Sequence, residues 1–109
     1  MDIKELSENI GLDEDEYIEM MNLFFESGGA DLKKLETAIS EGNAEKAHEA
    51  SHSLKGSSGS LGLDQLFELV KAIDDKDRLG NLDGLDETVK ELRRRYELLQ
   101  KDVEKCISE

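Results

Sequence analysis

The last part of the chain carries apolar residues at alternating steps of four and three positions. The series comprises Leu85, Val89, Leu92, Tyr96, Leu99, Val103 and Cys106. This spacing places the side chains along one side of a helix, which is stable only when that side is buried against a partner. A sheet is not a candidate partner, because no run of the chain is rich in the β-branched and aromatic residues that form strands. The chain also contains no proline. We therefore predict an all-α fold.

Earlier parts of the chain show the same helical spacing. The predicted helices are residues 2–10, 14–27 and 31–39, a helix that begins near Ala44, and a helix from residue 63 or 64 to about residue 79. Asp13 followed by Glu16 predicts an N-cap with a capping box for the second helix, and Gly28-Gly29 predicts its end. Short turns place successive helices antiparallel. We expect residues 1–109 to form one domain, an antiparallel four-helix bundle with short extra helical segments at its N-terminal end.

The charge of the chain restricts its partners. Fourteen Lys and Arg residues stand against 27 Asp and Glu residues, which gives a net charge of −13. So acidic a protein repels phosphate backbones and anionic lipids, so we expect neither nucleic acid nor membrane partners. No apolar run approaches the ~20 residues of a membrane span, and the start of the chain does not resemble a signal peptide. The single cysteine excludes an internal disulfide and favours a reducing compartment. We expect a cytoplasmic monomer.

The segment from His52 to Gly62, with the sequence HSLKGSSGSLG, combines a histidine, a lysine and three glycines. If it is helical, Lys55, Gly56 and Gly59 lie at about −60°, +40° and −20° from His52 at about 100° per residue. Leu54 and Leu61 then point to the opposite side, toward the core. A glycine inside a helix costs about 0.5–1 kcal/mol relative to alanine, so glycines on the exposed side indicate that another molecule approaches closely. The alternative is that residues 56–62 form a loop and the helix ends at Lys55.

His52 is the candidate nucleophile of this predicted face. A neutral imidazole has a ring nitrogen that can attack an electrophile. A phosphoryl group accepted there would bring negative charge, and Lys55, one turn along the same face, is placed to offset it. The alternative is an exposed histidine without a chemical role.

The segment resembles the signature of histidine-containing phosphotransfer (Hpt) domains, in which His-x-Leu-Lys-Gly is followed by small residues, an apolar residue and Gly. The flanking helices resemble that family more loosely. The resemblance implies that His52 accepts a phosphoryl group from the aspartate of a receiver domain and passes it to another receiver domain. It also implies that Lys55 screens the phosphate and that Gly56 admits the partner. The helical spacing places Gly59 on the same face, as a second candidate for partner access. The protein would then be a phosphocarrier in two-component signalling rather than an autonomous kinase.

The resemblance extends to residues outside the motif. It implies that Asp74 stands where the family often has a Glu or Gln near the histidine, although Asp is one methylene shorter. The family also docks its partners on apolar residues of a helix near the N-terminus, for which the candidates are Met20, Met21, Phe24 and Phe25. No Mg²⁺ site is evident in the chain, so we expect the receiver domain to supply this ion and the chain itself to bind no cofactor.

Two other functions remain open at this stage. The chain could be the phosphoacceptor domain of a chemotaxis-type histidine kinase, in which case a dimerisation and ATP-binding region follows it. It could also be an acidic docking module without chemistry, in which case substitution of His52 leaves signalling intact.

Three weaker signals are assigned structural roles. His48 lies four residues before His52, and with Glu45 and Glu49 nearby the pair could bind a metal; we expect a coincidental surface histidine and no metal site. An influence of His48 on phosphotransfer or partner choice is the alternative. Gly56, Gly59 and Gly62 do not form a nucleotide-binding loop, because no strand precedes them. Arg93-Arg94-Arg95 is expected to pair with acidic neighbours.

Overall fold

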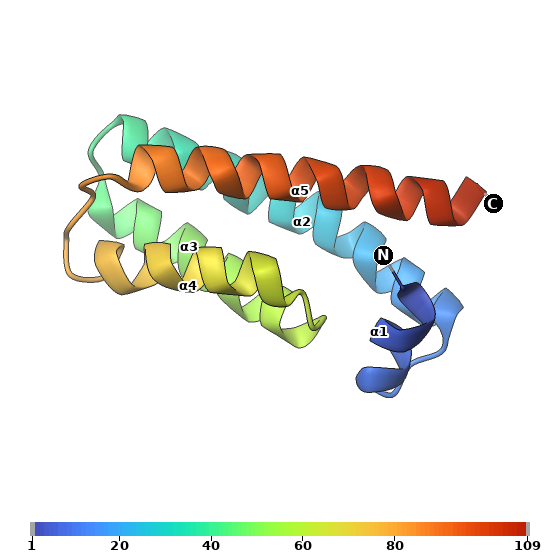
Figure 1. Ribbon diagram of the computed structural model, residues 1–109. Coiled ribbons are helices and arrows are strands. Elements are labelled where there is room, and N and C mark those ends of the chain that lie inside the picture. The colour runs from blue at the N-terminus through green and yellow to red at the C-terminus, as the bar shows by residue number, and fades with distance from the viewer. Residues whose placement is uncertain (1, 109) are drawn as a thin grey trace.

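The computed structural model describes residues 2–108, with the side chain of Ser108 left out. The described residues form five helices and no strand (Figure 1). The helices are α1 (Ile3–Asn9), α2 (Glu14–Ser40), α3 (Ala44–Ser60), α4 (Asp64–Asp77) and α5 (Leu85–Ser108). The predicted all-α class is confirmed. Within the described range, no helix combines the length and apolar character needed to cross a membrane.

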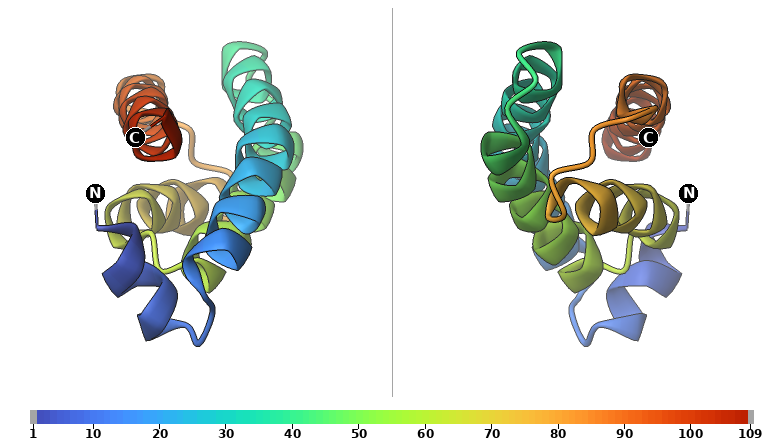
Figure 2. Two further views of the ribbon diagram at one scale, coloured as in Figure 1. Left: turned by 90° about the vertical axis from the view of Figure 1, so that its right-hand side faces the viewer. Right: turned by 90° about the vertical axis from the view of Figure 1, so that its left-hand side faces the viewer.

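The four long helices form the predicted bundle. Helix α3 lies between α2 and α4 and packs against both, and α5 closes the bundle by packing against α2 and α4 (Figure 2). The short helix α1 packs against α2 at one end. Short turns join α2 to α3 and α3 to α4, so these neighbours run antiparallel (Figure 1). The arrangement confirms the antiparallel bundle with a short N-terminal helical segment.

The core is built from the predicted apolar sides of the helices. In α5, the buried members of the regular series are Leu85, Val89, Leu92, Tyr96 and Val103, while Leu99 and Cys106 are partly buried against them. In α3 the buried residues are mostly small, namely Ala47, Ala50, Ser51, Leu54 and Ser58. Small side chains allow α3 to lie close to both of its neighbours, so the helix is held firmly while one side stays exposed.

The ends of the helices follow their sequence signals. Asp13 and Glu16 form the predicted capping box at the start of α2, with Asp13 Oδ1 accepting from the Glu16 amide at 2.8 Å. Asn43 caps α3 by accepting from the amide of Lys46 at 3.1 Å. Gly62, directly after the C-cap of α3, has a φ of 71°, a conformation that glycine adopts without strain.

The predicted break at Gly28-Gly29 is wrong, because α2 continues through both glycines to Ser40. The two glycines instead leave room for neighbouring side chains to pack against α2. A Cβ on Gly28 would lie 3.3 Å from Phe24 Cε1, and a Cβ on Gly29 would lie 2.8 Å from Tyr96 Oη. Asp31 therefore does not begin a helix; it lies within α2 and accepts a hydrogen bond from Ser53 Oγ of α3 at 2.6 Å.

Candidate functional site

The motif segment is helical up to Ser60, so the alternative in which a loop begins after Lys55 is excluded. His52 therefore lies on the exposed side of α3, where 68% of its side chain is accessible to solvent. Leu54 and Leu61 are both buried, as the helical spacing predicts. The chain thus presents one imidazole on a rigid helix that is anchored from behind.

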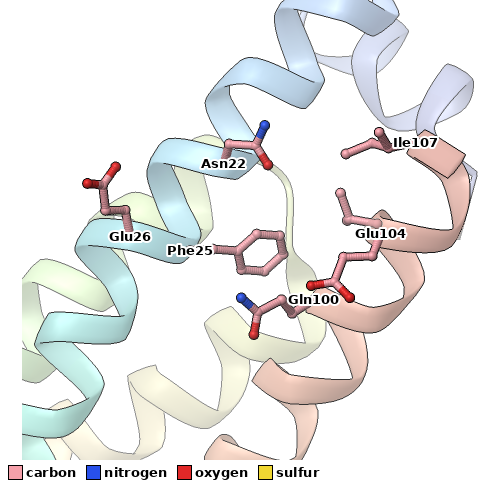
Figure 3. Close-up of a pocket in the computed structure, with 7 residues that line it drawn as sticks. Asn22, Phe25, Glu26, Gln100, Glu104 and Ile107 are labelled. Atoms are coloured by element: carbon pink, nitrogen blue, oxygen red, sulfur yellow. The ribbon is translucent and has the colours of Figure 1, made fainter.

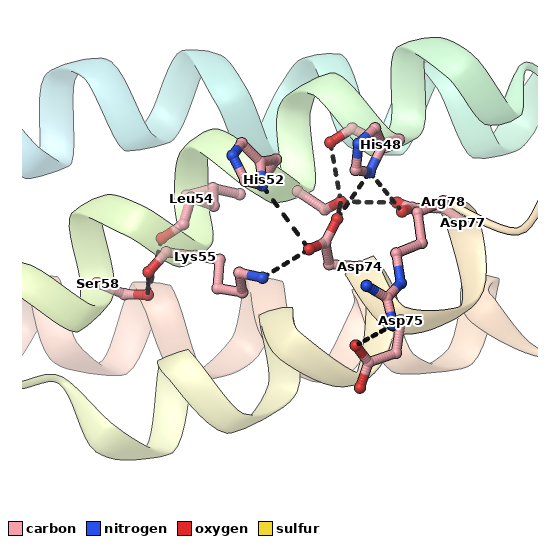
Figure 4. A network of polar contacts seen from close by, with 10 residues as sticks. His48, His52, Leu54, Lys55, Ser58, Asp74, Asp75, Asp77 and Arg78 are labelled. Atoms are coloured by element: carbon pink, nitrogen blue, oxygen red, sulfur yellow. Dashed lines mark hydrogen bonds and ion pairs between the residues drawn. The ribbon is translucent and has the colours of Figure 1, made fainter.

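Asp74 of α4 lies directly beside this imidazole. Its carboxylate is almost completely buried, and Oδ2 accepts a hydrogen bond from Lys55 Nζ at 2.8 Å (Figure 4). The same oxygen lies 3.9 Å from His52 Nδ1. Burial by itself would raise the pKa of Asp74, but hydrogen bonds from Lys55 and His48 outweigh it and lower this pKa below its ordinary value. Asp74 is therefore a stable negative charge facing the δ nitrogen of His52.

His48 belongs to the same polar network, so the prediction of a coincidental surface histidine is wrong. Its Nδ1 lies 2.8 Å from Asp74 Oδ1 and 3.5 Å from Asp77 Oδ1. Ser51 Oγ lies between the two aspartates. It donates to Asp77 Oδ2 at 2.7 Å and lies 3.3 Å from Asp74 Oδ1. The rings of His48 and His52 have their centroids 5.7 Å apart. Both histidines thus adjoin the same buried carboxylate from α4 (Figure 4).

Asp77 is a residue that the sequence analysis missed. Burial raises its pKa and the charge of Asp74 raises it further, while the hydrogen bond from Ser51 acts in the opposite direction. A signal was present in the sequence. Asp77 continues the buried series Leu66, Val70, Ile73 at steps of four, three and four, so it occupies a core position of α4. A charged residue at such a position requires polar partners. Ser51 donates a hydrogen bond to Asp77 Oδ2, and His48 Nδ1 lies 3.5 Å from the other carboxylate oxygen.

The two glycines of the predicted face differ in their surroundings. A Cβ on Gly56 would meet no described atom within 4 Å, apart from its chain neighbours and the backbone of its own helix. A Cβ on Gly59 would lie 3.2 Å from Phe67 Cδ2 of α4. Close approach by another molecule therefore remains the explanation for Gly56, whereas at Gly59 contact with Phe67 offers a second explanation for the missing side chain.

The comparison with protein-family models gives a match to the Hpt domain over residues 19–102. The chain belongs to the Hpt domain family. Members of this family carry out histidine phosphotransfer in phosphorelays, and the match spans His52 and its neighbours in the network. Searches of curated proteins and of solved structures gave no match.

In this Hpt domain, most of the apolar residues expected to dock a partner are not available. Met21 and Phe24 are buried. Phe25 is half-buried and faces α5, beside a hollow of about 300 Å³ between the two helices (Figure 3). The hollow is lined by Asn22, Phe25, Glu26, Gln100, Val103, Glu104 and Ile107. Of the four candidates, Met20 is the one that remains exposed, at 41%.

Leu23 is a second exposed apolar residue of α2, with 64% of its surface accessible, and the sequence analysis did not single it out. Met20 and Leu23 lie on the side of α2 that also carries Asp31 and Lys34. These two residues bond to Ser53 and Glu49 of α3. The exposed apolar side chains of α2 therefore flank the side of α3 that carries Gly56.

The arginine run of α5 pairs with acidic side chains, as predicted. Arg93 makes two hydrogen bonds to Glu36 of α2, at 3.1 and 2.5 Å. Arg94 and Arg95 both bond to Glu91 within α5. The run therefore contributes to the structure of the bundle, on helices other than the one that carries His52.

Proposed function

We propose that His52 is the phosphoacceptor of a phosphorelay, taking a phosphoryl group from a receiver-domain aspartate and passing it to another receiver domain. The observation that carries this proposal is the position of His52 beside Asp74. Nδ1 faces the buried carboxylate, which favours the tautomer with the proton on Nδ1. Nε2 then has the free electron pair, on an imidazole that is mostly exposed.

The transfer step balances on these atoms. Nε2 of His52 attacks the phosphorus of the aspartyl phosphate, the N–P bond forms, and the P–O bond to the aspartate breaks with release of its carboxylate. The phosphorylated ring retains its Nδ1 proton and carries a positive charge, which Asp74 stabilises. The reverse reaction transfers the group to the next receiver. We expect the receiver domain to supply the Mg²⁺ that neutralises the phosphoryl oxygens.

Lys55 and Gly56 support this reaction in different ways. Lys55 Nζ is held by Asp74 close to His52 and supplies a positive charge near the phosphoryl group. Gly56 leaves the surface beside His52 free of a side chain, so a partner can approach the helix backbone. We assign Gly59 a smaller share in access, because contact with Phe67 already accounts for its lack of a side chain.

The docking surface in this proposal comprises His52 and Gly56 of α3 with Met20 and Leu23 of α2. The two apolar side chains are exposed and flank α3, which suits an apolar patch on a receiver domain. The chain then acts as a cytoplasmic, monomeric phosphocarrier formed by residues 1–109. The partners in this proposal are receiver domains. A histidine kinase is the donor only under the alternative in which the chain is the phosphoacceptor domain of such a kinase.

The proposal is tested by incubating the protein with a receiver domain phosphorylated with ³²P. Label that is acid-labile and maps to His52 by mass spectrometry is expected, and His52→Gln should abolish it while circular dichroism shows an unchanged helix content. Label on His48, or label that persists in His52→Gln, would overturn the assignment. A transfer profile against a panel of receiver domains would then identify donor and acceptor.

A further inference from the structure

The cluster formed by His48, Asp74 and Asp77 has the composition of a metal site. One ligand atom from each residue lies within 4.8 Å of the other two. His48 Nδ1 is 2.8 Å from Asp74 Oδ1 and 3.5 Å from Asp77 Oδ1. Both aspartates are buried, at 2% exposure each, so this cluster is not a chance group of acidic residues on the surface.

Asp77 Oδ1 is the atom that indicates a ligand. The side chain of Asp77 is completely buried, yet this oxygen takes part in no hydrogen bond within residues 2–108. The distance of 3.5 Å between this oxygen and His48 Nδ1 exceeds the length of a hydrogen bond between charged groups. A buried carboxylate oxygen without a donor is costly, and here a second carboxylate, that of Asp74, adds like-charge repulsion. A cation between the two aspartates would remove both costs.

We propose that His48 Nδ1, Asp74 Oδ1 and Asp77 Oδ1 bind a divalent first-row transition metal of the Zn²⁺ type. One imidazole and two carboxylates suit Zn²⁺ and Co²⁺, whereas Mg²⁺ prefers oxygen ligands alone. Metal–ligand bonds of about 2.0–2.2 Å place neighbouring ligand atoms about 3–3.4 Å apart. The distances from His48 Nδ1 to Asp74 Oδ1, 2.8 Å, and to Asp77 Oδ1, 3.5 Å, lie on either side of this range.

The surroundings of the three atoms also suit this use. His48 is 40% exposed, so the ion has a path from solvent and a water molecule can complete its coordination. Ser51 donates to Asp77 Oδ2 and Lys55 donates to Asp74 Oδ2, so the non-ligating oxygen of each aspartate is already held. Such outer contacts orient ligating carboxylates. The site differs from the histidine pair that the sequence suggests, because His52 is not a ligand.

This inference does not depend on phosphotransfer, and it is tested without it. The full chain is titrated with Co²⁺ by visible absorbance and with Zn²⁺ by calorimetry, and one-to-one saturable binding with a raised thermal unfolding midpoint is expected. His48→Gln and Asp77→Asn should each weaken affinity at least about tenfold. Asp77→Asn keeps the size of the side chain, and circular dichroism verifies that it folds.

Glu45→Gln is the matched control, because it neutralises an exposed carboxylate one turn before His48 and should leave the affinity unchanged. If neither Co²⁺ nor Zn²⁺ binds saturably with one-to-one stoichiometry, the proposed site is wrong. Binding that is lost in His52→Gln but kept in Asp77→Asn also overturns it, since the metal would then belong to the two histidines on the surface of α3. Failure of the phosphotransfer experiment has no bearing on either result.

Discussion

Lys55 and Asp74 form a short ion pair between α3 and α4, with 2.8 Å separating Nζ from Oδ2. The Lys55 side chain is 28% exposed and that of Asp74 only 3%, so the aspartate depends on its partners more than the lysine does. The lysine therefore has two roles in the proposed function. It neutralises a buried carboxylate in the resting protein, and it supplies positive charge beside His52 when the phosphoryl group arrives.

Lys55→Met should therefore reduce both stability and transfer. We expect the free energy of unfolding to fall by about 2 kcal/mol, because Asp74 loses a charged hydrogen-bond donor while it stays buried. Urea unfolding measures this, and Lys71→Met, at an exposed position of the neighbouring helix, should change it by less than about 0.5 kcal/mol. In Asp74→Asn, the same Lys55→Met change should cost clearly less, since the buried charge is gone. Equal costs in both backgrounds would show that the pair contributes nothing.

The sequence predicted the motif helix well, because each signal there is local. The positions of His52, Leu54 and Leu61 follow from helical periodicity alone. The network around Asp74 could not be predicted in this way, because it depends on the register between α3 and α4. That register brings Asp74 and Asp77 beside Ser51 and His48, which lie more than twenty residues earlier.

At the glycine pair Gly28-Gly29 in α2, the break predicted from the sequence is wrong. Two consecutive glycines predict a break when only local propensity is considered. The structure shows instead that they admit Phe24, Leu54 and the hydroxyl of Tyr96, and Tyr96 lies in α5, far along the chain. Tertiary packing thus explains the glycines, and no feature of the sequence near Gly28 could reveal it.

Gly29→Ala tests that explanation. The new Cβ would lie 2.8 Å from Tyr96 Oη, and we expect a loss of about 1–3 kcal/mol in the free energy of unfolding from overpacking. In Tyr96→Phe the obstructing oxygen is absent, so the same substitution should stabilise the protein by about 0.5–1 kcal/mol through helix propensity. Denaturant unfolding of the four proteins measures both values. A loss of the same size in both backgrounds would contradict the packing explanation.

Tyr17 should make the stability of the fold depend on alkaline pH. Its buried hydroxyl donates to the carbonyl of Leu61 at 2.9 Å, and burial raises its pKa above the ordinary value of 10.0. Between these two pKa values the unfolded chain releases a proton that the folded chain retains, so the free energy of unfolding falls as the pH rises above 10. Tyr17→Phe should lower stability by about 1 kcal/mol at pH 7 through the lost hydrogen bond.

The difference between wild type and Tyr17→Phe should then narrow above pH 10, because the variant lacks the titrating group. Urea unfolding at pH 7 and at about pH 11 measures this change. Burial also raises the pKa of Tyr96, but that residue is present in both proteins, so its contribution cancels. A constant difference across this range would mean that Tyr17 ionises equally well in the folded protein.

Gly56 and Gly59 should respond differently to alanine. A Cβ on Gly56 meets open space, so Gly56→Ala should stabilise the protein by about 0.5–1 kcal/mol through helix propensity. Gly59→Ala should gain less or lose stability, because its Cβ presses against the ring of Phe67 at 3.2 Å. Thermal and urea unfolding of the two variants compare them directly. Equal stabilisation would show that Phe67 moves aside without cost. Partner access would then be the remaining explanation for Gly59, as it is for Gly56.

Gly56→Glu should block phosphotransfer while the fold is kept. The side chain projects from the exposed face next to His52, where it places bulk and negative charge against the incoming phosphoaspartyl site. Transfer from a phosphorylated receiver domain should slow by at least about tenfold, since 1.4 kcal/mol of repulsion has this effect at room temperature. Glu49→Gln, in which charge is removed from the same helix at an exposed position, should not slow transfer. If Gly56→Glu transfers at the wild-type rate, the partner does not approach α3 at Gly56, and the docking surface must lie elsewhere around His52.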